Sequence, residues 1–272
     1  MSMQLIAVDL DGTLLDSDGK VTTENRQALK KFNQQGGIIT LATGRSIQSA
    51  REVFAELKLN GYTLASNGAY VARIEDGEIA EVLKNYTIPA DTVKKALSFA
   101  MEEGVTVVAS RATQDDRINF AQDHNDVDSP YYAQFNLQES RVEDLWEKIR
   151  NGDISYFKLA FTDDNTSKLV KLRAKLEKKQ INSSYSDKYW LEVMAEGINK
   201  GAALNFLTKY LAIDLNEVLA IGDQENDLEM LEISGTSIGM ANAAPAVKQL
   251  ADRLTTSNND SGVATVLNEY LN

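Results

Sequence analysis

Cysteine is absent from this chain of 272 residues, and histidine occurs once, at His124. The lack of cysteine excludes disulfides, thiolate nucleophiles and thiolate metal sites. A single histidine argues against a Ser/His triad and against a cage of imidazole metal ligands. Catalysis by this chain therefore has to rely on carboxylates, lysine, hydroxyls and backbone amides. A metal cofactor, if the chain uses one, would be a hard cation that prefers oxygen ligands.

Long apolar runs and excess positive charge are also missing. No segment approaches the roughly 18 to 20 apolar residues that a membrane helix needs, and the N-terminus reaches the acidic Asp9 where a signal peptide would have its apolar stretch. We therefore expect a soluble, cytoplasmic protein with no membrane partner. The formal net charge of −12 argues against a nucleic-acid partner, which would require a basic face. Small molecules are the expected ligands.

Short aliphatic runs alternate with helical patterns in both terminal thirds of the chain. Residues 5–10 are almost all aliphatic, which suits a strand buried on both faces of a parallel sheet. Further strands are expected at residues 37–43, 62–66, 217–222 and 236–240, with helical patterns between them. This strand–helix–strand repeat predicts one parallel sheet, split in the sequence, with right-handed crossovers.

The middle third follows a different, α+β pattern. Two strands near residues 181–185 and 190–194 end this segment, and the second is expected to lead back to the first domain. The predicted fold class is α/β: a Rossmann-like parallel-sheet core formed by residues 1–86 and 188–272, with an α+β cap domain, residues 87–187, inserted into it. The length and the 43% apolar content are sufficient for two such domains.

The segment DLDGT, residues 9–13, lies where the first buried strand runs into a loop. Ligands of open parallel sheets bind at the carboxyl ends of the strands. Gly12 permits a tight turn there, so the carboxylates of Asp9 and Asp11 need not be equivalent. One can attack a substrate while the other exchanges a proton with the leaving group. The alternative is an ordinary Asp-Gly turn after a strand.

A second acidic segment, GDQEND at residues 222–227, also follows an aliphatic strand. Its acid and amide side chains concentrate oxygen ligands where a divalent cation could sit. The alternative is a cap for the following helix, supplied by Asn226 or Glu225. Both acidic segments fall at the same edge of the expected sheet, where carboxylates without a cation would repel one another. That coincidence favours a cation site.

Two further segments offer contacts to a phosphate. Thr43-Gly44-Arg45 (TGR) follows an apolar strand, and a threonine hydroxyl beside a backbone amide next to glycine can hydrogen-bond phosphate oxygens. The alternative is a helix cap followed by a surface arginine. Lys200 lies in the first turn of an expected helix, where a positive charge opposes the helix dipole unless it has a negative partner. Its position favours a phosphate partner.

These four segments, in this order, resemble the motifs of the haloacid dehalogenase superfamily of phosphotransferases. The superfamily's DxDGT motif matches residues 9–13, its hydroxyl residue after a strand matches Thr43, its lysine matches Lys200, and its GDxxND motif matches residues 222–227. The insertion resembles the α+β cap of the Cof-type sugar phosphatases. The strings SNGA before the insertion and MANA at residues 240–243 also fit that branch of the superfamily. The resemblance spans the whole chain.

The resemblance implies a phosphatase that uses Mg2+. Asp9 would attack phosphorus in line and form an aspartyl-phosphate, while Asp11 protonates the leaving alcohol and later deprotonates the attacking water. The resemblance places Mg2+ at Asp9, the backbone carbonyl of Asp11 and Asp223, with Asp227 nearby.

The resemblance also implies a set of contacts to the substrate. Lys200 and the Thr43 hydroxyl would compensate the negative charge of the transferring phosphoryl group. Gly44 and Leu10 would offer backbone amides, and Asn226, close to the Mg2+ site, would be a further substrate-binding residue.

The inserted cap would close over the pocket, exclude water and contact the leaving group. Conceivable contacts in or next to the cap are His124, Tyr131, Tyr132, Lys188 and Tyr189, and packing is the alternative role for the tyrosines.

Three functions stay open at this point. The first is hydrolysis of small phosphate monoesters such as sugar phosphates, which the Cof-like segments favour. The second is a phosphomutase that uses the same aspartyl-phosphate chemistry. The third is a regulator that binds a phosphorylated ligand or Mg2+ without turnover; the Asp9/Asp11 pair weighs against it, because such a receiver needs no second acid. The sequence leaves both a monomer and a homodimer open.

Overall fold

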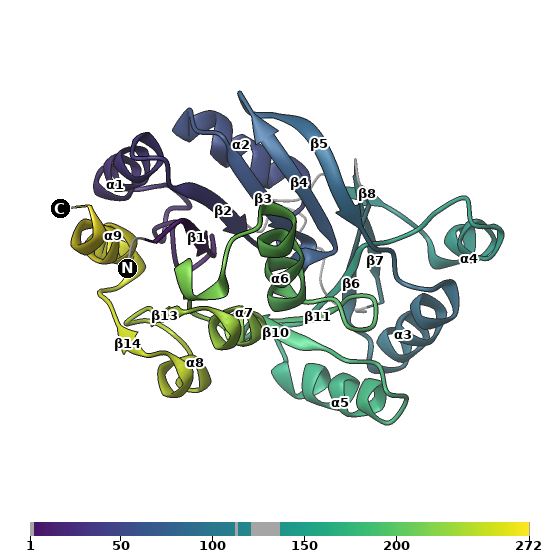
Figure 1. Ribbon diagram of the computed structural model, residues 1–272. Helices are drawn as coiled ribbons and strands as arrows, with labels where there is room; N and C mark the ends of the chain where they lie inside the picture. The colour runs from purple at the N-terminus through teal and green to yellow at the C-terminus, as the bar shows by residue number, and fades with distance from the viewer. Residues whose placement is uncertain (1–2, 112–113, 121–136, 272) are drawn as a thin grey trace.

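The computed structural model describes residues 3–111, 114–120 and 137–271. Within these ranges the chain forms two β-sheets, each with helices packed against it, in two lobes that lie side by side (Figure 1). The expected α/β fold class is confirmed. No helix in these ranges is long and apolar enough to cross a membrane.

The larger sheet has eight strands in the order β14-β13-β12-β1-β2-β3-β4-β5. Neighbours from β14 to β3 pair in parallel, and β4 and β5 are added antiparallel at one edge. The order reverses at the central strand β1, so the ligand crevice of such a sheet is expected at the C-terminal end of β1. The strands are β1 (Leu5–Val8), β2 (Ile38–Ala42), β3 (Gly61–Ala65), β4 (Tyr70–Glu75), β5 (Glu78–Asn85), β12 (Val218–Gly222), β13 (Thr236–Gly239) and β14 (Arg253–Leu254).

Helices cover both faces of this sheet, which explains why β1 and β12 are aliphatic and buried at every position. Helix α1 packs against α9, whereas α6 packs against α7, and α7 contacts α8. The helices are α1 (Thr23–Gln34), α2 (Ile47–Leu57), α6 (Lys200–Leu211), α7 (Leu228–Ile233), α8 (Pro245–Leu250) and α9 (Gly262–Tyr270), with short 3-10 turns η1 (Ser66–Gly68), η3 (Leu215–Glu217), η4 (Glu225–Asp227) and η5 (Asn258–Asp260).

The smaller sheet has six strands in the order β10-β11-β9-β6-β7-β8. Its helices lie on the side away from the larger sheet (Figure 1), and a separate apolar core fills the space beneath them. The strands are β6 (Thr106–Ser110), β7 (Asp115–Asn119), β8 (Leu137–Glu139), β9 (Lys158–Thr162), β10 (Ser184–Asp187) and β11 (Trp190–Val193); the helices are α3 (Ala90–Glu103), α4 (Val142–Asn151) and α5 (Thr166–Glu177). The other face of this sheet is turned toward the core lobe, and we call the lobe the cap.

The boundary between the cap and the core lies further along the chain than the expected residue 188. The segment expected to return to the core contains β11, which pairs with β9 and β10 in the smaller sheet. The cap sheet therefore extends through Val193. A strand of this length carries no signal for which sheet it joins, because only the pairing decides that.

Two other elements differ from the sequence-based expectation. The hairpin of β4 and β5 was not predicted, since β5 is an exposed edge strand whose charged residues obscure the strand pattern. The helix expected after the GDQEND segment is preceded by the turn η4, which lies within that segment, and then forms as α7.

Candidate active site

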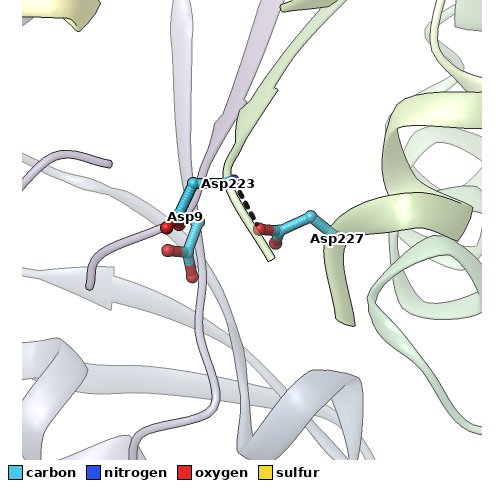
Figure 2. Close-up of side chains that lie close together, drawn as sticks. All are labelled: Asp9, Asp223 and Asp227. Atoms are coloured by element: carbon cyan, nitrogen blue, oxygen red, sulfur yellow. Dashed lines mark hydrogen bonds between the residues drawn. The ribbon is translucent and has the colours of Figure 1, made fainter. Parts of the chain in front are cut away.

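Three aspartates from different elements meet at the C-terminal edge of the core sheet (Figure 2). Asp9 follows β1, Asp223 follows β12, and Asp227 ends η4. The Asp9 amide donates to the Ile221 carbonyl at 3.1 Å, which brings the ends of the two parallel strands together. One carboxylate oxygen of each aspartate lies within 4.8 Å of the others, and all three residues are buried.

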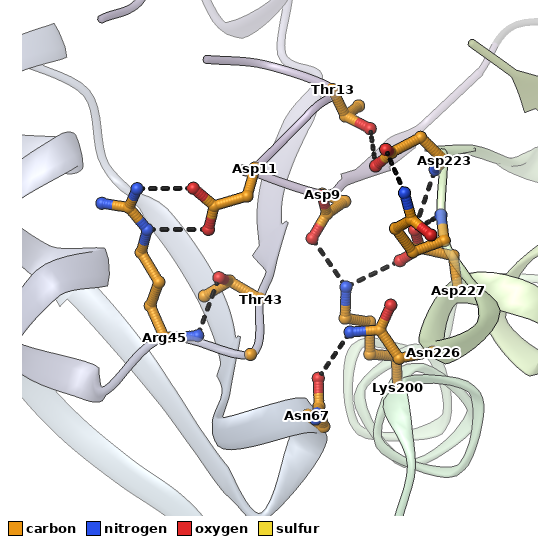
Figure 3. A network of polar contacts seen from close by, with 12 residues as sticks. Asp9, Asp11, Thr13, Thr43, Arg45, Asn67, Lys200, Asp223, Asn226 and Asp227 are labelled. Atoms are coloured by element: carbon orange, nitrogen blue, oxygen red, sulfur yellow. Dashed lines mark hydrogen bonds and ion pairs between the residues drawn. The ribbon is translucent and has the colours of Figure 1, made fainter. Parts of the chain in front are cut away.

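Lys200 is the cation of this cluster. It is the first residue of α6, and the helix begins there because the Asn199 side chain accepts a hydrogen bond from the Ala202 amide. The Lys200 Nζ atom donates to Asp9 Oδ1 and to Asp227 Oδ1, both at 2.6 Å (Figure 3). The ammonium is fully buried. Burial disfavours its charge, but the carboxylates of Asp227 and Asp9 outweigh that effect and raise the pKa of Lys200.

Burial acts on the aspartates in the opposite direction. It raises the pKa of Asp223 to about 7; the charge of Asp227 adds to the rise, and the hydrogen bond from Thr13 opposes it. It also raises the pKa of Asp9 well above its ordinary value, although Lys200 opposes this. The Thr13 hydroxyl donates to Asp223 Oδ1 at 3.1 Å. The cluster holds more negative charge than Lys200 alone compensates.

The donor set fits a hard divalent cation such as Mg2+. The three carboxylates exceed the one ammonium by two charges when all are ionised, and carboxylate oxygens are the ligands that Mg2+ prefers. Asp227 already accepts hydrogen bonds at both oxygens, from Lys200 and, at 2.9 and 3.1 Å, from the amides of Asp223 and Gln224. Asp227 thus orients the loop and the lysine, while Asp9 and Asp223 are better placed to hold a cation.

Asp11 lies apart from this cluster and is paired with Arg45. Arg45 donates to both carboxylate oxygens of Asp11, from Nε at 2.8 Å and from Nη2 at 2.5 Å (Figure 3). The Asp11 side chain is 55% exposed, whereas Asp9 is buried. The sequence left a surface role open for Arg45. The structure instead brings this arginine to the Asp11 carboxylate, so the TGR segment supplies two side chains to the site.

The other expected phosphate contacts gather around the same strand ends. Thr43 is buried directly after β2, and its hydroxyl oxygen accepts a hydrogen bond from the Arg45 amide at 3.0 Å. Gly44 lines the pocket next to Asp9 and Asp11. Leu10 connects these two aspartates, and its side chain is buried.

Asn226 is held by a second asparagine, Asn67, which belongs to the string SNGA. Its Nδ2 atom donates to Asn67 Oδ1 at 3.0 Å, and both residues are buried. Asn67 lies in η1, where it adopts a left-handed conformation with φ of 54°. This pair connects the end of β3 to the loop that carries Asp223 and Asp227.

A pocket of about 170 Å³ lies between the core and the cap. The core contributes two of the catalytic candidates, Asp9 and Asp11. The cap contributes strands β9, β10 and β11. The lining residues are Asp9, Asp11, Gly44, Arg45, Gln224 and Asn226 from the core and Lys158, Ser186, Asp187, Trp190 and Glu192 from the cap.

Of the cap contacts proposed from the sequence, the structure describes Lys188 and Tyr189, and neither is among the described residues that line this pocket. Lys188 and Tyr189 lie beside it: the Lys188 ammonium is 4.9 Å from the centre of the Tyr189 ring, and the Tyr189 amide donates to Asp187. His124, Tyr131 and Tyr132 lie outside the described residues. Lys158 and Glu192 were missed, because a charged residue within a short strand has no local signal that it faces a site.

The core sheet with carboxylates at its strand ends, covered by an inserted cap, is the architecture of an α/β enzyme that binds its ligand at the topological switch point. The family model described as haloacid dehalogenase-like hydrolase matches residues 6–267, and the chain belongs to this family. The resemblance seen in the sequence motifs is confirmed.

Named relatives span nearly the whole chain. A 5-amino-6-(5-phospho-D-ribitylamino)uracil phosphatase of Bacillus subtilis is 27% identical, over 98% of this chain and 97% of its own length. An HMP-PP phosphatase of Serratia proteamaculans is 30% identical, over 92% of this chain and 88% of its own. A solved haloacid dehalogenase-like hydrolase from B. subtilis is 26% identical and superimposes with a TM-score of 0.85, over 98% of this chain and 99% of its own. The expectation of an enzyme of the hydrolase class is confirmed.

Proposed function

We propose that this protein is a Mg2+-dependent phosphatase that hydrolyses small phosphate monoesters through an aspartyl-phosphate on Asp9. The buried cluster of Asp9, Asp223 and Asp227 beside the Lys200 ammonium carries this proposal. A carboxylate nucleophile that attacks an anionic ester needs positive charge close to the transferring group. The cluster combines such a carboxylate with a lysine and with oxygen ligands for a cation.

The residues of the cluster and the neighbouring Asp11 have distinct parts in the proposed reaction. The Asp9 oxygen forms a bond to phosphorus while the bond to the leaving oxygen breaks. Asp11 gives that oxygen a proton and later takes one from the water that releases phosphate. Lys200 stabilises the negative charge of the transferring group, and Asp227 holds Lys200 in place. Mg2+, when bound by Asp9, Asp223 and the carbonyl of Asp11, adds further charge neutralisation.

The substrate's phosphate group would be held by the remaining residues at the strand ends. The Thr43 hydroxyl and the amides of Gly44 and Leu10 are proposed to donate to its oxygens, and Asn226 to support them from the opposite side of the pocket.

The size and cover of the pocket indicate a small ester. A volume of about 170 Å³ is below the range of drug-sized ligand sites. A relative named for a phosphorylated ribityl compound supports a substrate of the sugar-phosphate type, and one named for HMP-PP supports a small phosphorylated metabolite. In this proposal residues 87–193 form the specificity cap, and the protein acts in the cytoplasm without a nucleic-acid or membrane partner.

The nucleophile is tested with Asp9→Asn, assayed for Mg2+-dependent release of phosphate from p-nitrophenyl phosphate. We expect turnover to fall by about 10³-fold or more, because the amide is a poor nucleophile. Asp18→Asn is the matched control, since Asp18 is an exposed aspartate of the loop after β1. Retained turnover in Asp9→Asn would show that another residue attacks phosphorus. Product analysis with sugar phosphates separates hydrolysis from isomerisation by a phosphomutase.

A further inference from the structure

Two opposite charges are buried on the face of the cap sheet that is turned toward the pocket. Lys158 begins β9 and Glu192 lies in the neighbouring strand β11, and they are 2% and 3% exposed. Their Nζ and Oε1 atoms are 2.5 Å apart. A buried ion pair is weak evidence for a stability role, because an apolar pair of similar volume often serves as well or better. The other contacts of Lys158 and Glu192 indicate what the pair does.

Lys158 crosses from the cap to the core. Its Nζ atom also donates to the carbonyl oxygen of Gly44, at 2.5 Å. That carbonyl belongs to the same peptide group as the Arg45 amide, which donates to Thr43 Oγ1 at 3.0 Å. The peptide between Gly44 and Arg45 is therefore held at both ends, by a cap lysine on one side and by Thr43 on the other. The orientation of this peptide group sets the position from which the Arg45 side chain extends.

Glu192 makes a second crossing. Its Oε2 atom accepts a hydrogen bond from Asn67 Nδ2 at 2.5 Å, and Asn67 in turn accepts from Asn226. A β-carbon added to Gly44 would lie 3.3 Å from Glu192 Oε2 and 3.3 Å from Asn67 Oδ1. Glycine at this position thus leaves the space that the cap carboxylate occupies.

We propose that Lys158 and Glu192 are positioning residues that assemble the active site when the cap is seated. Lys158 sets the Gly44–Arg45 peptide, and through it the arginine that binds Asp11. Glu192 sets Asn67, and through it the amide of Asn226. The cap in this proposal completes two core loops as well as covering the substrate. The inference rests on the proposed phosphatase function for its kinetic test but not for its structural test.

The kinetic test uses Lys158→Met, Glu192→Gln and the double variant, assayed with an alkyl phosphate, whose leaving oxygen needs the proton that Asp11 is proposed to supply. Each single variant is expected to lower kcat by about 10- to 100-fold with KM changed by less than about threefold, because a small misplacement of catalytic groups costs this much. The double variant should be no worse than the less active single variant, because the ion pair makes Lys158 and Glu192 hold each other in place, and residues that act as one unit give non-additive losses. Lys175→Met, an ion-paired lysine of α5, is the control and should keep wild-type kcat.

The structural test measures amide hydrogen exchange in the peptide that covers residues 43–46. Lys158→Met should accelerate exchange there by about tenfold or more, and Lys175→Met should not. Thermal melting verifies that each variant is folded, and Glu192→Gln, which keeps the side-chain volume, serves if Lys158→Met does not fold. Losses of kcat that multiply in the double variant, or exchange that matches wild type in a folded variant, would overturn the proposal. If the wild type lacks turnover, the phosphatase assignment fails, and the exchange rates alone decide the positioning role.

Discussion

Arg45 binds both carboxylate oxygens of Asp11, and it does so on the side of Asp11 that points away from Asp9 (Figure 3). A bidentate guanidinium contact fixes the orientation of a carboxylate more firmly than a single hydrogen bond. In the proposed reaction Asp11 transfers a proton to the leaving oxygen, which would require Asp11 to exchange this partner for the substrate. Arg45 therefore sets the starting position of the proposed proton donor.

Replacing Arg45 with methionine tests this relationship. We expect kcat for an alkyl phosphate to fall by about 10- to 100-fold, because Asp11 loses its fixed orientation. The fall should be smaller for p-nitrophenyl phosphate, whose leaving group departs without a proton. Steady-state kinetics with both esters measure the difference. Arg51→Met, which removes an arginine of α2 paired with the exposed Glu78, is the control. Equal losses for the two esters would contradict a role through Asp11.

Lys200→Met tests the charge balance of the buried cluster. When the Lys200 ammonium is removed, Asp9 and Asp227 lose their cationic partner in a buried site. Breaking such a pair lowers the free energy of unfolding by about 3–5 kcal/mol. Urea unfolding without Mg2+ should show this loss, and adding Mg2+ should restore part of it. Lys209→Met, at the exposed end of the same helix, should change little. An equally stable Lys200→Met protein in chelator would refute the charge argument.

The raised pKa of Asp223 predicts how pH affects the metal-free protein. The folded protein holds the Asp223 proton up to a pH of about 7, whereas the unfolded chain releases it near 3.8. The unfolded state thus binds fewer protons between these values, and the free energy of unfolding falls as pH rises from about 4 to about 7. Mg2+ requires ionised carboxylates, so the rise in Tm that Mg2+ causes should grow over the same window.

Thermal melting across that pH window, with chelator and with Mg2+, checks this expectation. Asp223→Asn should remove most of the Mg2+ effect and flatten the pH dependence of the metal-free protein. A Mg2+-induced rise in Tm that is equally large at the acidic and neutral ends would show that Asp223 does not gain a proton in the folded state.

The strand-end cluster could be predicted from the sequence because parallel strands bring their carboxyl ends to one edge. Asp9 and Asp223 each follow an aliphatic run, and the structure brings their side chains together as that rule requires. Lys200 was identifiable because a lysine in a first helical turn needs a negative partner, and it has two.

The contacts between the cap and the core could not be predicted in the same way. Lys158 meets Gly44, and Glu192 meets Asn67, only because two separately folded sheets dock in one orientation. Neither residue has a neighbour in the sequence that marks it as part of a site. The sequence did not indicate that β11 joins the cap sheet for the same reason, since strand pairing is a long-range property.

Gly12 offers a test of the cluster in which backbone strain can be separated from crowding. It has a φ of 77°, and an added β-carbon would lie 2.4 Å from Asp223 Oδ2. Gly19 has a φ of 73°, but nothing lies within 4 Å of its added β-carbon. Alanine at either position costs about 1 kcal/mol or more in backbone strain. Only Gly12→Ala should also displace the Asp223 carboxylate.

We therefore expect Gly12→Ala to raise the Mg2+ concentration needed for half-maximal activity by at least about tenfold and to lower kcat, because a displaced ligand weakens the metal site. Gly19→Ala should lose a similar amount of stability and keep the wild-type Mg2+ requirement. Mg2+ titrations of activity, together with urea unfolding of both variants, separate the two effects. If both variants respond alike to Mg2+, strain in the loop explains the loss, and the contact between Gly12 and Asp223 does not define the metal site.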